Sequence, residues 1–270
     1  LIGFVFFLIW ELGEKHPVVD LTLFTRRNFW VGTVSLSLGY GVFFGNVVLL
    51  PLWLQQFMGY TATWAGFIMA PVGVLAIVAT PFVGKRVNAT DPRILSTVAF
   101  ITFAVVLWMR SLFNTQVDEF TLLIPAFAQG IPMAFLFVPL MSLILMGLPP
   151  ERIPAAAGLS NFVRITAGAF GTSIFTTLWE SRATLHHAQL TETINNASIP
   201  ATQALSDFAT LGLSREQGLT YINHLIDQQA FMLSANDIFY ASAVLFLGLT
   251  AIIWLARPTR ISNPLPISSH

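Results

Sequence analysis

Residues 160–171 read SNFVRITAGAFG, a run of small and apolar residues that contains one charged side chain, Arg164. The meaning of that charge depends on the solvent around the chain. Of the 270 residues, 55% are hydrophobic and 10% are charged, and the mean hydropathy is +0.72. Soluble domains carry roughly 25% charged residues. The composition therefore indicates a membrane protein.

Six segments are long and apolar enough to cross a bilayer, which takes about 20 residues. They are residues 30–54, 62–84, 94–112, 120–147, 155–179 and 237–256. The chain starts in another apolar run without the basic segment of a signal peptide, so residues 1–10 are interpreted as the tail of a truncated membrane helix. We expect an all-α membrane protein, with residues 1–29 as the end of a preceding helix and a cytoplasmic linker, residues 30–256 as a six-helix domain, and residues 257–270 as a cytoplasmic tail.

The positions of the basic residues predict the orientation, because Lys and Arg are retained on the cytoplasmic side of a membrane. One set of alternate connections holds Lys15, Arg26, Arg27, Lys85, Arg86, Arg93, Arg152, Arg257 and Arg260. The other set holds Arg110, Arg182 and Arg215. This asymmetry predicts a cytoplasmic C-terminus.

Residues 180–236 form a polar connection that is too long for an idle link in a compact domain. Ser214 and Gln217 have the spacing of a helix capping box. Apolar residues follow at helical spacing after it, and others precede it between Ala201 and Leu211. We expect an extracytoplasmic loop that contains short amphipathic helices, which cover the exit side or dock a partner.

The first and fourth expected spans carry polar residues and prolines, which membranes tolerate where a helix faces protein or a wet cavity. The first contains Tyr40, Asn46 and Pro51, and the fourth places Pro125, Gln129, Pro132, Leu136 and Pro139 on one helical face. These two spans are candidates for lining a substrate path. In the alternative interpretation, the prolines only bend packed helices.

The second and fifth spans carry stripes of small residues, which let helices approach closely. The stripes are Gly66, Ala70, Gly73, Ile77, Thr80 and Gly84 in one span, and Ala157, Asn161, Arg164, Gly168 and Gly171 in the other. Arg164 therefore faces protein and not lipid. It lies ~13 Å from the start of its span, so both a functional role and a snorkelling anchor at the interface remain open.

Three stretches carry a resemblance to a known family. They are LLPLWLQQFMGYTATWAGFIMAPVG (residues 49–73), GLPPERIPAAAGLSNFVRITAGAFGTSIFTT (residues 147–177) and HHAQLTET (residues 186–193). They resemble the EmrB-type drug:proton antiporters, the 14-helix branch of the major facilitator superfamily. The resemblance implies the C-terminal half of such a transporter, a six-helix unit with a 3+3 inverted repeat, and weak echoes between the first and fourth spans agree with it.

The resemblance also implies partners and a gating loop. The partners are the N-terminal half of the same transporter, a periplasmic adaptor (membrane fusion) protein that residues 180–236 would face, an outer-membrane channel, small-molecule drugs, protons and membrane lipid. The loop residues Gly84, Lys85, Arg86, Asp91 and Arg93 look like a degenerate copy of the cytoplasmic motif that locks the halves together. A plain positively charged loop is the alternative. The location implied is the bacterial inner membrane.

We expect the substrate-binding residues to be Tyr40, Phe44, Asn46, Gln129, Phe135, Asn161 and Arg164. Aromatic residues such as Phe43 and Phe137 on the same spans suit bulky apolar or cationic compounds, although they also fit ordinary helix packing. By resemblance, the function is proton-coupled multidrug efflux by alternating access.

Several other functions are disfavoured by the sequence. The spans hold no Asp or Glu away from their ends and no His, so an embedded enzyme is not expected, and the proton carrier is expected in the N-terminal half. His186, His187 and His224 do not have the spacing of a metal site. We expect no metal and no cofactor. Because the net charge is zero, we also expect no nucleic-acid partner. A membrane receptor or an assembly scaffold without transport remains the alternative.

Overall fold

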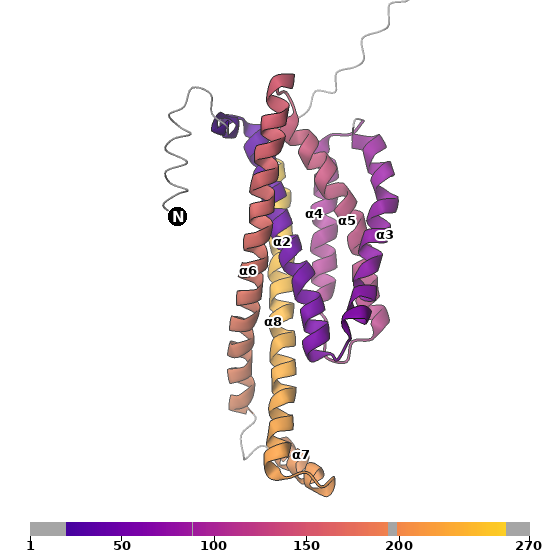
Figure 1. The fold of residues 1–270 in the computed structure, drawn as a ribbon, viewed down its shortest axis with the longest axis vertical. Coiled ribbons are helices and arrows are strands. Elements are labelled where there is room, and N and C mark those ends of the chain that lie inside the picture. The colour runs from indigo at the N-terminus through magenta and orange to yellow at the C-terminus, as the bar shows by residue number, and fades with distance from the viewer. Residues whose placement is uncertain (1–19, 88, 194–198, 258–270) are drawn as a thin grey trace, which may run out of the picture.

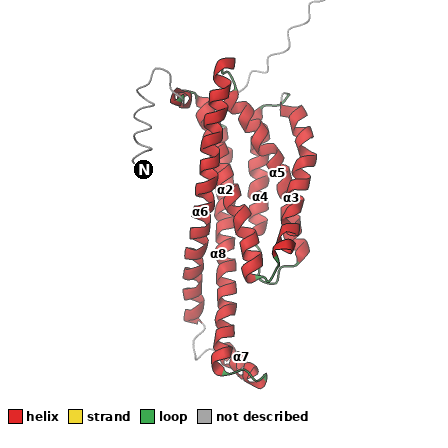
Figure 2. Cartoon of the chain, in the orientation of Figure 1, coloured by secondary structure: helices red, strands yellow, loops and turns green. Residues whose placement is uncertain are grey.

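The computed structural model describes residues 20–87, 89–193 and 199–257, and all regular structure within these ranges is helical (Figure 2). The α-helices are α2 (Arg27–Phe57), α3 (Ala62–Val87), α4 (Pro92–Arg110), α5 (Glu119–Leu145), α6 (Ile153–Thr193), α7 (Ile199–Thr210) and α8 (Arg215–Ile253). Two 3-10 helices, η1 (Leu21–Thr25) and η2 (Pro150–Arg152), precede α2 and α6. The predicted helix remnant at residues 1–10 lies outside the described residues.

Short polar side chains start several of these helices by accepting hydrogen bonds from otherwise unpaired backbone N–H groups. Asp91 accepts from the backbone N–H of Arg93 at 2.9 Å, and Asp118 accepts from that of Thr121 at 3.1 Å. Ser214 and Gln217 form the predicted capping box at the start of α8. The starts of α4, α5 and α8 are therefore encoded locally.

Five of the described helices, α2, α3, α4, α5 and α8, are long and apolar enough to cross a membrane. The α6 helix is not among them, because Asn161, Arg164 and several hydroxyl residues lower the hydropathy of its expected span. It nevertheless packs along α2 and α8 (Figure 1). The spans predicted in α2 to α5 agree with the observed helices to within three residues.

Helices from the first set of three (α2, α3, α4) pack on helices from the second set (α5, α6, α8). The α2 helix packs on α6, and α5 packs on α3 in the same way, so the first helix of each set of three packs on the second helix of the other set. The α4 and α8 helices, the third of each set, pack on each other. This exchange is the pattern of a 3+3 repeat.

The sequence prediction of a loop at residues 180–236 is corrected by the course of α6 and α8. Both helices continue past the ends of α2 to α5 and carry α7 at their far end (Figure 1). The predicted spans 155–179 and 237–256 are therefore only parts of helices of 41 and 39 residues. The short helix predicted upstream of the capping box is present as α7.

Polar contacts between α6 and α8 explain why the helices do not end at the bundle. The guanidinium of Arg182 pairs with the carboxylate of Asp237 at 2.7 Å, and Nε2 of His186 lies 2.8 Å from the same carboxylate. Ser234 donates to the backbone oxygen of Trp179 at 2.6 Å. We call this paired part of α6 and α8, together with α7, the extension.

The proline-bearing face of α5 is buried. Pro125, Gln129, Pro132, Leu136 and Pro139 are all among the buried residues of this helix. In this structure that face packs against neighbouring helices. The exposed side of α5 instead presents Phe127, Ile131 and Phe137.

Candidate substrate site

The site is built at a crossing where the backbones of α2 and α6 touch. A Cβ atom on Gly171 would lie 2.2 Å from the backbone oxygen of Gly41, and a Cβ atom on Gly41 would lie 2.8 Å from that of Ala167. No side chain fits at those distances, so glycine is required at both positions. The small-residue stripe predicted on this helix is thus used within the chain, against α2.

The close crossing brings Arg164 of α6 over two aromatic rings. Its guanidinium carbon lies 4.4 Å from the ring centroid of Tyr40 on α2 and 4.8 Å from that of Phe137 on α5. Both distances are in the range of cation–π attraction. One terminal nitrogen donates to Oδ1 of Asn161, while Nε is buried without a hydrogen-bond partner. Arg164 therefore connects three helices.

A second ring extends this group along α2. The rings of Tyr40 and Phe44 lie 4.5 Å apart. Tyr40 also contacts Gly168, where an added Cβ atom would come within 3.1 Å of the Tyr40 ring. We name Tyr40, Phe44, Phe137, Asn161 and Arg164 the Arg164 cluster.

The structure brings together four of the seven predicted substrate-binding residues, namely Tyr40, Phe44, Asn161 and Arg164. It places Asn46 elsewhere: this side chain is 1% exposed and donates to Ser242 on α8 at 3.1 Å. Phe135 is half-buried on α5, two residues before Phe137. Residues two apart on a helix do not share a face, so we do not count Phe135 in the cluster.

Gln129 also lies outside the Arg164 cluster, because it pairs with a residue that the sequence analysis did not select. Its Oε1 accepts a hydrogen bond from Arg110 at 2.5 Å, and the two side chains are 1% and 0% exposed. Nε and one terminal nitrogen of Arg110 have no hydrogen-bond partner among the described residues. The sequence analysis placed Arg110 among the basic residues of a connection between helices. The apolar helix that precedes it was the only sign in the sequence that it is buried.

The sequence of this chain is similar to that of a known protein family. Residues 3–172 match the Major Facilitator Superfamily. The chain belongs to this superfamily.

Individual relatives give the comparison more detail. The chain is 43% identical over 258 residues to the multidrug export protein EmrB of Escherichia coli (strain K12), which covers 95% of this chain and 50% of that protein. It is 42% identical over 253 residues to the fatty acid resistance protein FarB of Neisseria gonorrhoeae, covering 94% and 50% of the two chains. It is 38% identical over 259 residues to the probable multidrug resistance protein EmrY of Escherichia coli (strain K12), covering 95% and 50%. The chain therefore spans about half the length of the curated relatives that it matches.

Superfamily membership and these relatives point to a transporter rather than an enzyme. Together with the five apolar helices they identify a multi-pass membrane protein. Within the described residues, no group of three His, Cys, Asp or Glu side chains could hold a metal ion. His186 and His187 contact different carboxylates, those of Asp237 and Asp227, as expected for adjacent residues on a helix.

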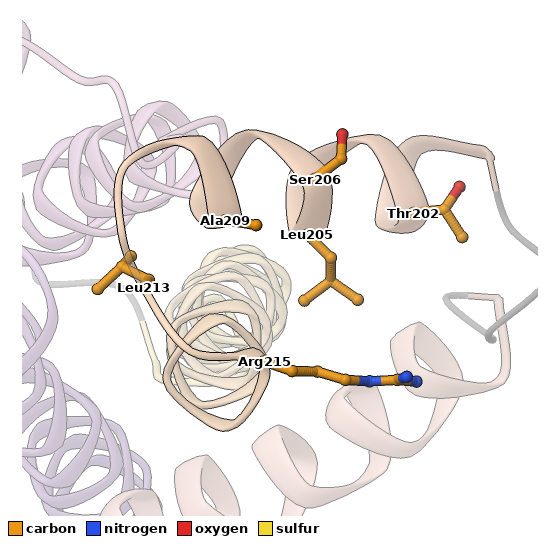
Figure 3. Close-up of a pocket in the computed structure, with 6 residues that line it drawn as sticks. All are labelled: Thr202, Leu205, Ser206, Ala209, Leu213 and Arg215. Atoms are coloured by element: carbon orange, nitrogen blue, oxygen red, sulfur yellow. The ribbon is translucent and has the colours of Figure 1, made fainter.

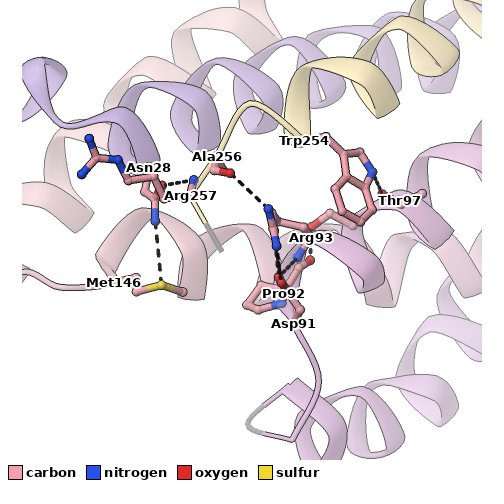
Figure 4. A network of polar contacts seen from close by, with 10 residues as sticks. Asn28, Asp91, Pro92, Arg93, Thr97, Met146, Trp254, Ala256 and Arg257 are labelled. Atoms are coloured by element: carbon pink, nitrogen blue, oxygen red, sulfur yellow. Dashed lines mark hydrogen bonds and ion pairs between the residues drawn. The ribbon is translucent and has the colours of Figure 1, made fainter. Parts of the chain in front are cut away.

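The predicted gating loop divides into two parts in this superfamily member. Gly84, Lys85 and Arg86 are exposed in the last turn of α3. Asp91 and Arg93 are instead engaged inside the chain, as Figure 4 shows. The Arg93 guanidinium pairs with Asp91 at 2.7 Å and lies 5.0 Å from the ring centroid of Trp254 beyond the end of α8.

We call Asp91 and Arg93, with their contacts to the end of α8, the clamp. Its electrostatics favour the ionised form of Asp91. Burial alone would raise the pKa of the Asp91 carboxyl, but the hydrogen bonds and the charge of Arg93 outweigh it, so the pKa lies below its usual 3.8. A further bond from Arg93 to the backbone oxygen of Ala256, at 3.2 Å, fixes the end of α8. The clamp ties α4 to α8.

A cavity of about 320 Å³ lies in the extension, away from the Arg164 cluster (Figure 3). It is formed between α7 and the start of α8, and its lining residues are Thr202, Leu205, Ser206, Ala209, Leu213 and Arg215. The cavity is open and close to the far end of the molecule. It is separate from the helices that form the candidate site.

Proposed function

We propose that this chain is the C-terminal half of a proton-coupled multidrug efflux transporter of the bacterial inner membrane, and that it works by alternating access. The names of its relatives, which refer to multidrug export, multidrug resistance and fatty acid resistance, support export of small molecules. The observation in the structure that supports it most is the Arg164 cluster, a charged and aromatic group at the meeting point of three helices.

The N-terminal half of the same transporter is the partner that this proposal requires. Only 17% of the apolar window of α3 is buried. A Cβ atom on Gly66, Gly73 or Gly84 of this helix would meet nothing within 4 Å. An exposed stripe of small residues in a membrane helix suits close packing against another helix. In the proposal, the other half covers α3 and the outer side of α6, and the exposed Lys85 and Arg86 reach across to it.

The domain assignment belongs to the same proposal. Residues 30–256 would form the transporter half, and residues 1–29 and 257–270 would lie before and after it, with the C-terminus in the cytoplasm. The spans supply no carboxylate between their ends, so the coupled proton would be carried by the N-terminal half. The extension would face a periplasmic adaptor and, through it, an outer-membrane channel.

Bulky apolar compounds remain the expected substrates, because rings of Phe44 and Phe137 belong to the cluster. The cationic compounds expected from the sequence are less well supported. The guanidinium of Arg164 already lies against Tyr40 and Phe137. A cationic drug would compete with it for the same ring faces.

A drug-susceptibility panel tests the proposal in cells. Cells that lack the intact gene should become more sensitive to several bulky apolar compounds, and the full-length gene should restore resistance. Residues 1–270 expressed alone should not restore it, because alternating access needs two halves that move about a central site. Restored resistance from residues 1–270 would contradict the half-transporter assignment. Equal sensitivity with and without the intact gene would favour a receptor or a scaffold.

A further inference from the structure

Amide side chains of α8 fix the extension to the end of the bundle. Nε2 of Gln228 donates to the backbone oxygen of Phe57, the last residue of α2, at 2.6 Å. Nδ2 of Asn236 donates at 2.8 Å to the backbone oxygen of Phe113, in the connection between α4 and α5. The α8 helix is therefore bonded to two separate parts of the bundle end.

Aromatic side chains join the same place to α6. The ring of Phe231 on α8 stacks on that of Phe57, with centroids 4.3 Å apart. The ring of Trp179 on α6 meets Phe231 edge-on at 5.0 Å, and its Nε1 donates to the backbone oxygen of Phe231 at 2.9 Å. We name Phe57, Trp179, Gln228, Phe231 and Asn236 the root of the extension.

The two helices that leave the root have no residue of the kind that bends a helix. Sharp kinks occur mostly at proline or glycine, and neither occurs at residues 172–193 of α6 or 219–247 of α8. Both segments are helical throughout (Figure 1). Ala183, Ile226 and Ala230 are also buried, so the contact between the helices is packed.

We propose that the extension is a rigid lever, which moves as one body with this half of the transporter and carries its movement away from the membrane. This inference rests on the proposed function, because alternating access is largely a rocking of one half against the other. The lever needs both features described above, a root that is bonded to several helices and an arm without a hinge.

The length of the arm sets the size of the expected movement. The extension continues ~20 Å past the bundle end, because α8 runs from Arg215 to Gln228 at ~1.5 Å per residue. The bundle end lies ~23 Å from the middle of α2, a helix of 31 residues. One rotation about the middle of the bundle should therefore displace the tip roughly twice as far as the bundle end.

Distances between spin labels in the full-length transporter test the lever, measured by double electron–electron resonance at acidic and at neutral pH. One label is placed at the tip by Leu211→Cys and one at the bundle end by Phe120→Cys, both at side chains that are 76% exposed. A third label lies at the outer end of the N-terminal half. The distance from tip to bundle end should be narrowly distributed and equal at both pH values. The distance from tip to N-terminal half should shift roughly twice as much as that from the bundle end.

A loosened root should separate the two movements. Gln228→Ala combined with Asn236→Ala removes both amide bonds, so the distribution of the tip-to-bundle distance should broaden while the bundle end still shifts. Thr220→Ala is the control, because the hydroxyl of this exposed residue bonds to the backbone of its own helix. It should match the wild type. If size-exclusion profiles show that the double variant is unfolded, Gln228→Ala alone takes its place.

Other results would overturn the inference in distinguishable ways. A broad tip-to-bundle distribution in the wild type would mean that the extension is hinged, whatever the variants show. A double variant with a distribution as narrow as that of the wild type would refute the role of the root. If neither end shifts while proteoliposomes still export drug, the lever is wrong and the transport function stands. If neither end shifts and no drug is exported, both fail.

Discussion

The guanidinium of Arg164 on α6 lies over the ring of Tyr40 on α2, 4.4 Å from its centroid. The contact depends on the glycines beside it, because α2 and α6 approach to the distance at which Gly171 has no room for a Cβ atom. It also lies far from the ends of the helices. Arg164 is ~16 Å along α6 and Tyr40 is ~20 Å along α2. The structure thus holds this charge against protein, between α2, α5 and α6.

The α2–α6 crossing should not tolerate a single added methyl group. Gly171→Ala would place its Cβ atom 2.2 Å from the backbone oxygen of Gly41, and we expect it to destabilise the protein by about 1–3 kcal/mol. Gly248→Ala on α8 is the control, because a Cβ atom there meets nothing within 4 Å. The thermal unfolding midpoint of the full-length protein in detergent should fall only for Gly171→Ala. Equal midpoints for the two variants would mean that the crossing is looser than described.

The Arg110–Gln129 pair should be important for stability. Gln129→Leu removes the acceptor of a guanidinium that is 0% exposed, and we expect it to cost about 3 kcal/mol because a buried charged group loses its hydrogen-bond partner. The double variant Arg110→Met with Gln129→Leu should recover most of this loss, since apolar side chains replace the polar pair. Unfolding midpoints of the purified full-length variants measure both effects. A double variant as unstable as Gln129→Leu would show that the charge is not the cause.

The Asp91–Arg93 clamp should give stability that depends on pH. The pKa of Asp91 is lowered in the folded chain, so its contribution is present above the usual value of 3.8 and is lost as the pH falls through the lowered value. Asp91→Asn removes this contribution at every pH. The wild-type protein should therefore unfold at a higher temperature than Asp91→Asn at pH 7, and the two midpoints should converge as the pH falls through the lowered pKa of Asp91. A difference that stays constant as the pH is lowered would rule out the linkage.

These pairs also show how far the sequence could predict the structure. The helices and their caps were predictable, because Asp91, Asp118 and Ser214 act on N–H groups two or three residues away. The position of Arg164 on a close-packing face followed from the spacing of Gly168 and Gly171. The partner helix did not, because a stripe of small residues does not specify which helix it contacts.

The remaining differences between the prediction and the structure have a common physical cause. Asn46 and Gln129 were assigned to a substrate path because polar residues in a membrane span need partners, and the structure supplies those partners inside the bundle, from Ser242 and Arg110. The loop at residues 180–236 was expected because its residues are polar. Arg182 and Asp237 instead pair across two continuous helices. Long-range pairing of this kind leaves no local signal.

The extension should be needed for export across the envelope and not for drug binding. Only residues 190–218 should be replaced. Gln228 bonds to the backbone oxygen of Phe57 at the end of α2, and Ser234 bonds to that of Trp179 on α6, so both should stay. A Gly/Ser linker in place of residues 190–218 should abolish resistance in cells while drug binding to the purified full-length transporter is unchanged. Loss of binding would contradict a docking role. Full resistance would show that no partner uses this end of the molecule.

The most direct measurement of the central claim is drug movement driven by a pH gradient in proteoliposomes that contain the full-length transporter. We predict that the wild-type protein moves drug into an acidic lumen. Arg164→Ala should insert normally and move drug about tenfold more slowly per protein molecule, because it loses the guanidinium contacts of the cluster. Arg164→Lys should lie between them, since it keeps the charge without the planar fork of donors. A wild-type protein that moves no drug under the gradient, or an Arg164→Ala variant with the full wild-type rate, would contradict the account.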